Sequence, residues 1–469
     1  MAYYGYLPSI VAHRSFDLGP TFDRFIAAGV PVARQFLEIT LPNGLTADYK
    51  QVGSALLALP FYVITHGIFL LVPGRQDPDI SAEYQLAFTA ASLFYGVLAL
   101  VLVYRFARQL FGARPATLAT AGVLLATPLV AYLLFEPSYS HTFSVCATTA
   151  FALYLYVTRH DRRWTQWFLA GVLGGLATIT HAQEVLFFGL VPVEAIWQIW
   201  HRRWGLRLIP NYVALLLGAL LPVLPQLAID QLLFSRWLPP TAPNISFDFA
   251  HPHLLDLLVS TRHGWLAWSP LVVMALLGLP SVVRRLEWFG IGLVAVGLAE
   301  FMVNASLSDW WGGLAFGSRR LTDQTLLLGL GLAAACAWLL QRRLAPLAIG
   351  LVAAGIAWTG LLLAQYYYVI GADIGPPWRD FLLGQLQAVR YVPRLFAQGA
   401  VVREALNAHW LLAGYSAAVV AGVAGLALWF GNRLGLFRDS GGGDRPDPGR
   451  ARKQDRSPRP ATVRSPATG

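Results

Sequence analysis

The segment DWWGGLAFGSRRLTDQTLLLGLGLAAACAWLLQRR, Asp309–Arg343, decides the fold class of this chain. A polar stretch with three glycines leads into a mostly apolar run, Leu321–Leu340, which ends on Arg342 and Arg343. About 20 apolar residues are enough to cross a bilayer as a helix, and arginines just beyond such a run are typical of its cytoplasmic end. The segment therefore predicts a membrane-spanning helix whose polar start faces the opposite compartment.

The same pattern recurs along the whole chain. Of its 469 residues, 56% are hydrophobic and 13% are charged, whereas soluble domains carry about 25% charged residues. A soluble fold cannot bury so much apolar surface, so the composition predicts an all-α polytopic membrane protein. The predicted spans are Val52–Val72, Tyr84–Tyr104, Ala116–Leu134, Thr142–Val157, Trp167–Thr180, Val185–Trp200, Leu208–Ala228, Leu266–Val283, Phe289–Val303, Leu321–Leu340, Leu344–Gln365 and Trp410–Phe430.

Arginines gather in every second connection between these spans. Because cytoplasmic connections are enriched in Lys and Arg, we assign this set to the cytoplasm of a multi-pass protein of the cell membrane, with a cytoplasmic C-terminus. The net charge of +10 then reflects topology, and nucleic acid is not an expected partner. The tail 439–469 is predicted to be disordered and basic. The basic connections contain Arg105, Arg108 and Arg114; Arg159, Arg162 and Arg163; Arg202, Arg203 and Arg207; Arg284 and Arg285; Arg342 and Arg343; and Arg433.

Two segments allow more than one interpretation. Val52–Val72 contains Pro60 and His66, so it either spans the bilayer or lies on the outer surface as a juxtamembrane helix, with residues 1–51 as an extracytoplasmic first loop. Between Trp378 and Phe396, apolar residues recur at helical spacing among charged ones. That pattern predicts either an amphipathic helix at the outer interface or a packed helix within a loop.

The outer connection FEPSYSH, Phe135–His141, combines a carboxylate with an imidazole. Such a pair can take a proton from a hydroxyl group or hold a divalent ion, so Glu136 and His141 are candidate catalytic residues. Alternatively, Glu136 and Ser138 cap a helix that starts near Pro137. A divalent cation is the cofactor that the sequence leaves open.

Two further outer connections carry polar side chains. In THAQE, Thr180–Glu184, the side chains of His181, Gln183 and Glu184 face the outer compartment, either to bind substrate or to solvate a tight hairpin. In STRHGWLAW, Ser260–Trp268, Arg262 is suited to a phosphate group or to lipid headgroups.

Two carboxylates fall inside apolar runs, where an ionised group is costly. Glu300 lies near the outer end of its predicted helix, from which it can reach the outer polar residues. Glu194 lies deeper, and we expect it to form a hydrogen bond between helices.

Arg319 and Arg320 lie on the outer side, against the charge bias of the chain. Guanidinium groups bind phosphate oxygens in a bidentate manner, so both are candidate phosphate ligands. Alternatively, the two arginines are structural and pair with Asp309 and Asp323.

The residues before this arginine pair, from Asp309 to Gly317, are candidates for separate functions. Gly312, Gly313 and Gly317 permit close bending of the backbone around a ligand. The rings of Trp310 and Trp311 offer flat faces to a sugar or a prenyl chain, and Asp309 is a candidate base or metal ligand.

Four motifs together resemble the GT-C superfamily, which comprises polytopic glycosyltransferases of the protein-mannosyltransferase-like and lipopolysaccharide-sugar-transferase-like kind. They are YYGYLPSIVAHRSFDL (Tyr3–Leu18), FEPSYSH (Phe135–His141), RHGWLAWSPL (Arg262–Leu271) and WWGGLAFGSRRLTD (Trp310–Asp323). The likeness extends from Tyr3 to about Phe430, and the order and spacing of the motifs make it specific.

The resemblance implies a GT-C-like fold in which a sugar leaves a polyprenyl-phosphate carrier on the extracytoplasmic side, and it implies substrate contacts for Tyr3 and Tyr4. Juxtamembrane helices follow the first outer loop in such enzymes, which favours the surface position of Val52–Val72 and leaves about 11 spans. An acidic residue normally precedes the paired tyrosines, after a first transmembrane helix. The sequence begins two residues before Tyr3, so we expect that helix and aspartate to be missing, through an internal start or in a degenerate homologue.

These observations predict an integral membrane glycosyltransferase, a hexosyl- or pentosyltransferase of cell-envelope glycan biosynthesis that inverts the anomeric configuration. Its expected partners are a polyprenyl-phosphate-linked sugar donor, membrane lipids, and a glycan, lipid or protein acceptor. The alternatives are a lipid-linked-sugar flippase and an inactive truncated homologue that acts as an assembly partner. The candidate catalytic residues are Glu136, His141 and Asp309; the candidate substrate-binding residues are Tyr3, Tyr4, His181, Gln183, Arg262, Trp310, Trp311, Arg319 and Arg320.

Overall fold

The computed structural model describes residues 2–29, 41, 43–71, 77–201, 205, 208–238, 245–371 and 375–398. Regular structure in this part of the chain is helical, and one isolated antiparallel bridge joins Phe247 to Leu307. The predicted all-α class is therefore confirmed. The predicted span Trp410–Phe430 and the basic tail 439–469 lie outside the described residues.

The helices follow the predicted spans closely. Of the described helices, six are long and apolar enough to cross a membrane, and Gly53–Leu71 is among them. The elements are α1 Ala2–Val11, α2 Gly19–Ala27, α4 Gly53–Leu71, α5 Ala82–Phe111, α6 Ala113–Leu125, η1 Ala131–Phe135, α7 His141–Val157, α8 Trp164–Thr180, η2 Ala182–Gly189, α9 Leu190–Trp200, α10 Ile209–Phe234, α11 Leu254–Val259, α12 Trp265–Trp268, α13 Leu271–Leu286, α14 Trp288–Ala305, η4 Arg319–Gln324, α15 Thr325–Gln341, α16 Ala345–Gln365, η5 Tyr366–Ile370, α17 Trp378–Ala388, η6 Val389–Tyr391 and α18 Val392–Gln398.

Three predicted spans are interrupted rather than continuous. Ala116–Leu134 divides into α6 and the π-helical turn η1, because Pro128 lacks the N–H that a continuous helix needs. Val185–Trp200 starts as the 3-10 helix η2 before α9, and Leu266–Val283 divides into α12 and α13 at Pro270. Each interruption lies toward the end of the run that was predicted to face outward. Irregular backbone at membrane depth is tolerated where protein covers it or where it lines a cavity, so these breaks point to a polar site.

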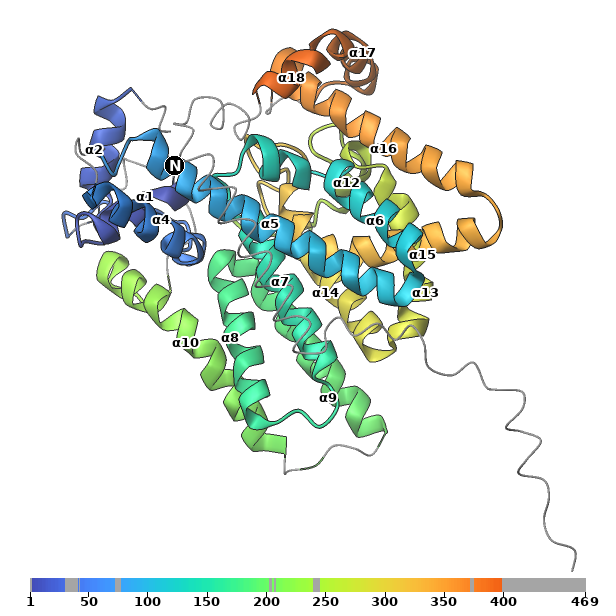
Figure 1. Cartoon of the computed structure of the whole chain (residues 1–469), viewed down its shortest axis with the longest axis horizontal. Helices are drawn as coiled ribbons and strands as arrows, with labels where there is room; N and C mark the ends of the chain where they lie inside the picture. Colours follow the sequence, from blue (N-terminus) through green and yellow to red (C-terminus); the bar gives the residue numbers. More distant parts are fainter. Residues whose placement is uncertain are drawn as a thin grey trace, which may run out of the picture.

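Small residues let the helices approach closely. In Figure 1, α8 and α10 run beside each other in the lower part of the bundle. A Cβ atom at Gly171 of α8 would lie 2.0 Å from the Leu215 carbonyl oxygen, and one at Gly218 of α10 would lie 2.0 Å from the Phe168 carbonyl oxygen. Only glycine fits at either position, and this close approach is typical of helix pairs in membranes.

Connections that share a predicted side of the membrane meet in the structure. At the basic end, Arg285 donates to the Leu110 carbonyl oxygen over 2.6 Å. Glu194 pairs with Arg162 at 3.2 Å, and both side chains are buried, in keeping with the structural function expected of Glu194. At the opposite end, Gln183 donates to the Arg320 carbonyl oxygen over 2.7 Å. The charge pattern thus sorted these connections correctly between the two ends of the bundle.

The N-terminal helices are fixed to this bundle through a buried carboxylate. Figure 1 shows α1, α2 and α4 gathered at one end of the molecule. Asp79, just before α5, is fully buried; it contacts His13 Nε2 at 3.0 Å and Arg24 Nε at 3.3 Å, and it accepts a hydrogen bond from Thr21 over 2.9 Å. One carboxylate therefore connects α1 and α2 to the start of α5.

We predict that Asp79→Ala lowers the thermal unfolding temperature of the detergent-purified protein strongly. The change removes the hydrogen bond from the buried Thr21 hydroxyl group to a charged acceptor, which contributes about 1.5–3 kcal/mol. It also removes the contacts of His13 and Arg24 with the same carboxylate. The matched control is Asp77→Ala, since Asp77 also pairs with Arg24 but its side chain is 33% exposed, and exposed pairs contribute about 0–1 kcal/mol. Equal shifts for both variants would show that Asp79 does not hold the N-terminal helices.

Candidate functional site

The two adjacent arginines have different surroundings. Arg320 forms a bidentate pair with Asp309: Nη2 lies 2.6 Å from Oδ2 and Nη1 lies 3.1 Å from Oδ1. Arg320 Nη1 also donates to the Asp309 carbonyl oxygen over 2.9 Å. The charge of Arg320 is therefore balanced within the loop. For Asp309, this agrees with the alternative interpretation of the sequence, in which the arginines pair with nearby carboxylates. Asp323, by contrast, forms no ion pair with either arginine in the described part of the chain.

Arg319 is the open member of the pair. Among the described residues, no ion pair involves Arg319, and its buried Nε has no hydrogen-bond partner. Its guanidinium carbon lies 5.5 Å from the centre of the Tyr139 ring. Gly312, with φ of +82°, lies on the other side of Arg319, and a Cβ atom there would come within 3.3 Å of Arg319 Nε. The predicted glycine bend therefore makes room for this side chain.

Glu136 lies near this guanidinium. Tyr367 of η5, just after α16, donates a hydrogen bond to Glu136 Oε1 over 2.9 Å, while Oε2 is buried with no partner among the described residues. Burial raises the pKa of the Glu136 carboxyl group, and the hydrogen bond from Tyr367 and the charge of Arg319 act in the opposite direction. The carboxylate is thus more basic than an exposed glutamate and retains a free oxygen.

His141 and Tyr3 lie behind this pair. His141 begins α7 and is 2% exposed; its Nδ1 lies 3.3 Å from Thr322 Oγ1, and its Nε2 has no partner in the described residues. The next residue back, Ser140, donates to the Tyr3 hydroxyl group over 3.1 Å. The FEPSYSH segment thus lies between the N-terminal tyrosines and η4, as expected if these motifs share one site.

Of the other predicted site residues, Arg262, Trp310 and Trp311 lie at the loop 309–320, whereas Tyr4 lies away from it. The Arg262 guanidinium stacks on Trp311 with 3.7 Å to the ring centre, and Trp310 stacks on His253 with ring centres 6.0 Å apart. One face of each tryptophan is therefore covered by protein. Tyr4 is not brought to the site, because it is buried in an aromatic cluster and donates to the Pro78 carbonyl oxygen.

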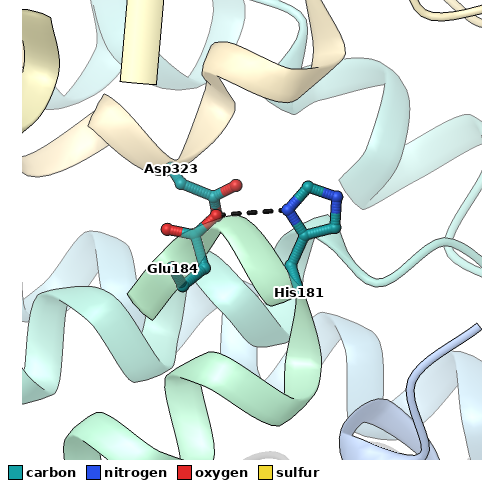
Figure 2. A group of neighbouring side chains, drawn as sticks. All are labelled: His181, Glu184 and Asp323. Atoms are coloured by element: carbon teal, nitrogen blue, oxygen red, sulfur yellow. Dashed lines mark hydrogen bonds and ion pairs between the residues drawn. The ribbon is translucent and has the colours of Figure 1, made fainter. Parts of the chain in front are cut away.

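A second group of polar side chains lies deeper. Figure 2 shows His181, at the end of α8, beside Glu184 of η2 and Asp323 of η4. The three offer ligand atoms within 4.8 Å of one another, and Ser144 donates to Asp323 over 2.5 Å. Desolvation and the nearby charges of the arginine pair lower the pKa of His181 to about 3, so its imidazole is neutral. Burial and neighbouring carboxylates raise the pKa of Glu184.

Sequence reasoning did not assign a site function to Asp323 or Tyr367, and for Glu184 it left both substrate binding and solvation of a hairpin open. An available signal was that an acid at the edge of an apolar run is costly and needs a partner. That argument was applied to Glu300, which faces Asp323 and Glu184 in the structure. The prediction that Glu300 reaches the outer polar residues agrees with this placement.

The sequence of this chain matches a known protein family over part of the candidate site. A family model described as dolichyl-phosphate-mannose-protein mannosyltransferase matches residues 80–229. This range contains Glu136, His141 and the segment 181–184, whereas the loop 309–323 lies outside it. The match confirms the predicted resemblance over these residues. No curated protein matches the chain.

Two crystal structures of ArnT from Cupriavidus metallidurans are similar to the chain. The apo state shares 16% identity at a TM-score of 0.44, covering 87% of this chain and 70% of that one. The structure bound to undecaprenyl phosphate shares 17% identity at a TM-score of 0.40, covering 78% of this chain and 64% of that one.

We predict that Arg320→Gln and Asp309→Asn lower the unfolding temperature by similar amounts and that the double variant is no worse than either single one. Each single change leaves a largely buried charge without its partner, at a cost of about 3 kcal/mol, whereas the double change removes both charges. Thermal unfolding of the four proteins in the same detergent measures this coupling. Additive losses would mean that the two side chains act independently.

Proposed function

We propose that this protein is a membrane glycosyltransferase that takes a sugar from a polyprenyl-phosphate donor and passes it to an acceptor hydroxyl group on the extracytoplasmic face. One observation carries the proposal: Arg319, a guanidinium without a counter-ion among the described residues, lies near the Glu136 carboxylate at the polar end of an apolar bundle. The family-model match over residues 80–229, which contains Glu136, supports it.

The two arginines contribute in different ways. Arg319 binds the donor phosphate, because its guanidinium fork matches phosphate oxygens and no carboxylate of the described residues forms an ion pair with it. Arg320 is a positioning residue, since both of its terminal nitrogens are held by Asp309. This refines the sequence prediction that both arginines bind phosphate, and it moves Asp309 from candidate base to partner of Arg320.

Glu136 is the first candidate for the general base. Its free oxygen accepts the proton of the acceptor hydroxyl group while that oxygen attacks the anomeric carbon of the donor. The bond between the anomeric carbon and the phosphate oxygen breaks, and the polyprenyl phosphate leaves with one additional negative charge. Arg319 stabilises that charge where it develops. A single displacement of this kind inverts the anomeric configuration.

The direct test is binding of polyprenyl phosphate, the leaving group, to protein in lipid nanodiscs. We predict that Arg319→Ala weakens binding about ten-fold or more, since a hydrogen bond to a charged group contributes about 1.5–3 kcal/mol. Arg319→Lys keeps the charge but loses the fork, so we expect an intermediate loss. Arg284→Ala, an exposed arginine at the opposite end of the bundle, is the control.

Unchanged affinity in Arg319→Ala would remove the phosphate assignment. Release of polyprenyl phosphate from a panel of polyprenyl-phosphate sugars tests the reaction itself, and Glu136→Gln should lower its rate at least about 100-fold. Binding without release by the wild-type protein would contradict enzyme function and favour an assembly partner. Translocation of intact donor across liposomes would favour a flippase.

The base assignment also predicts a pH effect. Tyr367→Phe removes a hydrogen bond that lowers the pKa of Glu136, so the pKa rises further. Because the base must be ionised, the rate in the variant should fall at a higher pH than in the wild type, and the two rates should converge at alkaline pH. The measurement is the pH profile of kcat/KM. An acid limb that does not move would show that Glu136 is not the titrating base.

A further inference from the structure

The polar group behind the proposed transfer site has the chemistry of a metal centre. His181 lies between α8 and η2, Glu184 lies in η2 and Asp323 lies in η4, and their candidate ligand atoms all lie within 4.8 Å of one another. Figure 2 shows the three side chains pointing toward a common point. His181 Nδ1 lies 3.2 Å from Glu184 Oε1. Two ligands of a tetrahedral ion at about 2.1 Å are about 3.4 Å apart, so this spacing already fits an ion.

A fourth side chain, outside this trio, is directed at the same place. Glu300 of α14 is fully buried, it faces Glu184 and Asp323, and it lines a small cavity together with Asp323. Within the described ranges, no donor reaches either oxygen of Glu300, Glu184 Oε2 or Asp323 Oδ2 with regular hydrogen-bond geometry, although the Gln324 side chain and the neighbouring carboxyl groups lie beside Glu300. Four buried carboxylate oxygens therefore lack a donor at one point of the bundle.

Burial of unpaired carboxylates in a membrane bundle is costly unless a cation or protons compensate them. Among the described residues, no arginine forms an ion pair with Glu184, Asp323 or Glu300, and Arg320 is already paired with Asp309. A divalent ion balances two of the three negative charges that Glu184, Asp323 and Glu300 carry when ionised, and one proton balances the third. We propose that His181, Glu184 and Asp323 bind one divalent transition-metal ion, with Glu300 beside it.

The donor set indicates the class of metal. One imidazole nitrogen with carboxylate oxygens suits Zn²⁺ or Mn²⁺, whereas Ca²⁺ and Mg²⁺ prefer oxygen ligands alone. Ser144, which donates to Asp323 over 2.5 Å, orients a ligand in the way that outer hydrogen bonds commonly do in metal sites. The ion joins η2 to η4, and η4 carries Arg319. The site therefore fixes the segment that presents the phosphate ligand, but its existence does not depend on glycosyl transfer.

The test is metal content of the full chain, purified in detergent, stripped with EDTA and dialysed against Zn²⁺ or Mn²⁺. We expect about one ion per chain by mass spectrometry, and a rise in unfolding temperature on adding the ion. Glu184→Gln and Asp323→Asn, which keep the side-chain shape, should each weaken binding at least about ten-fold and abolish the thermal shift. Glu300→Gln should have a smaller effect.

The matched control is Asp256→Asn. Asp256 and His253 form an exposed pair with the same i,i+3 spacing as His181 and Glu184, and with 3.1 Å between nitrogen and oxygen. This control therefore shows whether losing any His–carboxylate pair has the same effect as losing the buried site. Metal content of the control should equal that of the wild type. If the stripped wild-type chain takes up neither ion, the proposal is overturned whether or not the variants fold, and the carboxyl groups share protons instead. Stoichiometric binding that persists in Glu184→Gln and Asp323→Asn would also overturn it.

Discussion

The ion pair between Arg320 and Asp309 is the interaction on which the polar end of this protein depends. It closes the loop 309–320 on itself with two side-chain contacts, and it leaves the neighbouring guanidinium of Arg319 as the open positive charge. Because adjacent residues in the 3-10 helix η4 point in different directions, fixing one side chain directs the other toward Tyr139 and Glu136. Two adjacent arginines therefore have different surroundings: Arg320 is held in an ion pair, and Arg319 is the one that we propose binds phosphate.

The sequence predicted the spans, the two ends of the bundle and most of the residues that meet at the polar end, because apolar length and arginine bias are local signals. It could not choose between a phosphate-binding and a structural function for Arg319 and Arg320, since the answer depends on which side chain reaches Asp309. The contacts of Asp323 with Glu184 and Glu300 could not be predicted from the sequence either, because these residues come from three separate segments and only packing brings them together. The sequence also could not distinguish the paired tyrosines: both are buried, but Tyr3 contacts Ser140 whereas Tyr4 contacts the Pro78 carbonyl oxygen.

The polar end has two layers with different electrostatics. Arg319 and Glu136 lie in the outer layer, where an anionic lipid head and an acceptor hydroxyl group can meet. The deeper layer contains His181, Glu184 and Asp323, and the segment η4 belongs to both layers. Positive charge is therefore presented by a helix whose other side is anchored among carboxylates. If Arg319 binds phosphate as proposed, such an arrangement fixes its side chain before the donor binds and lowers the ordering cost of binding.

A structure of the full-length protein with polyprenyl phosphate bound in a lipid nanodisc, determined by electron cryomicroscopy, tests this account most directly. The account predicts phosphate oxygens within hydrogen-bond distance of the Arg319 guanidinium, the Glu136 carboxylate facing the space beside the phosphate, and the Arg320–Asp309 pair intact. A phosphate bound at the opposite, basic end of the bundle, or held by Arg320 after release from Asp309, would contradict it.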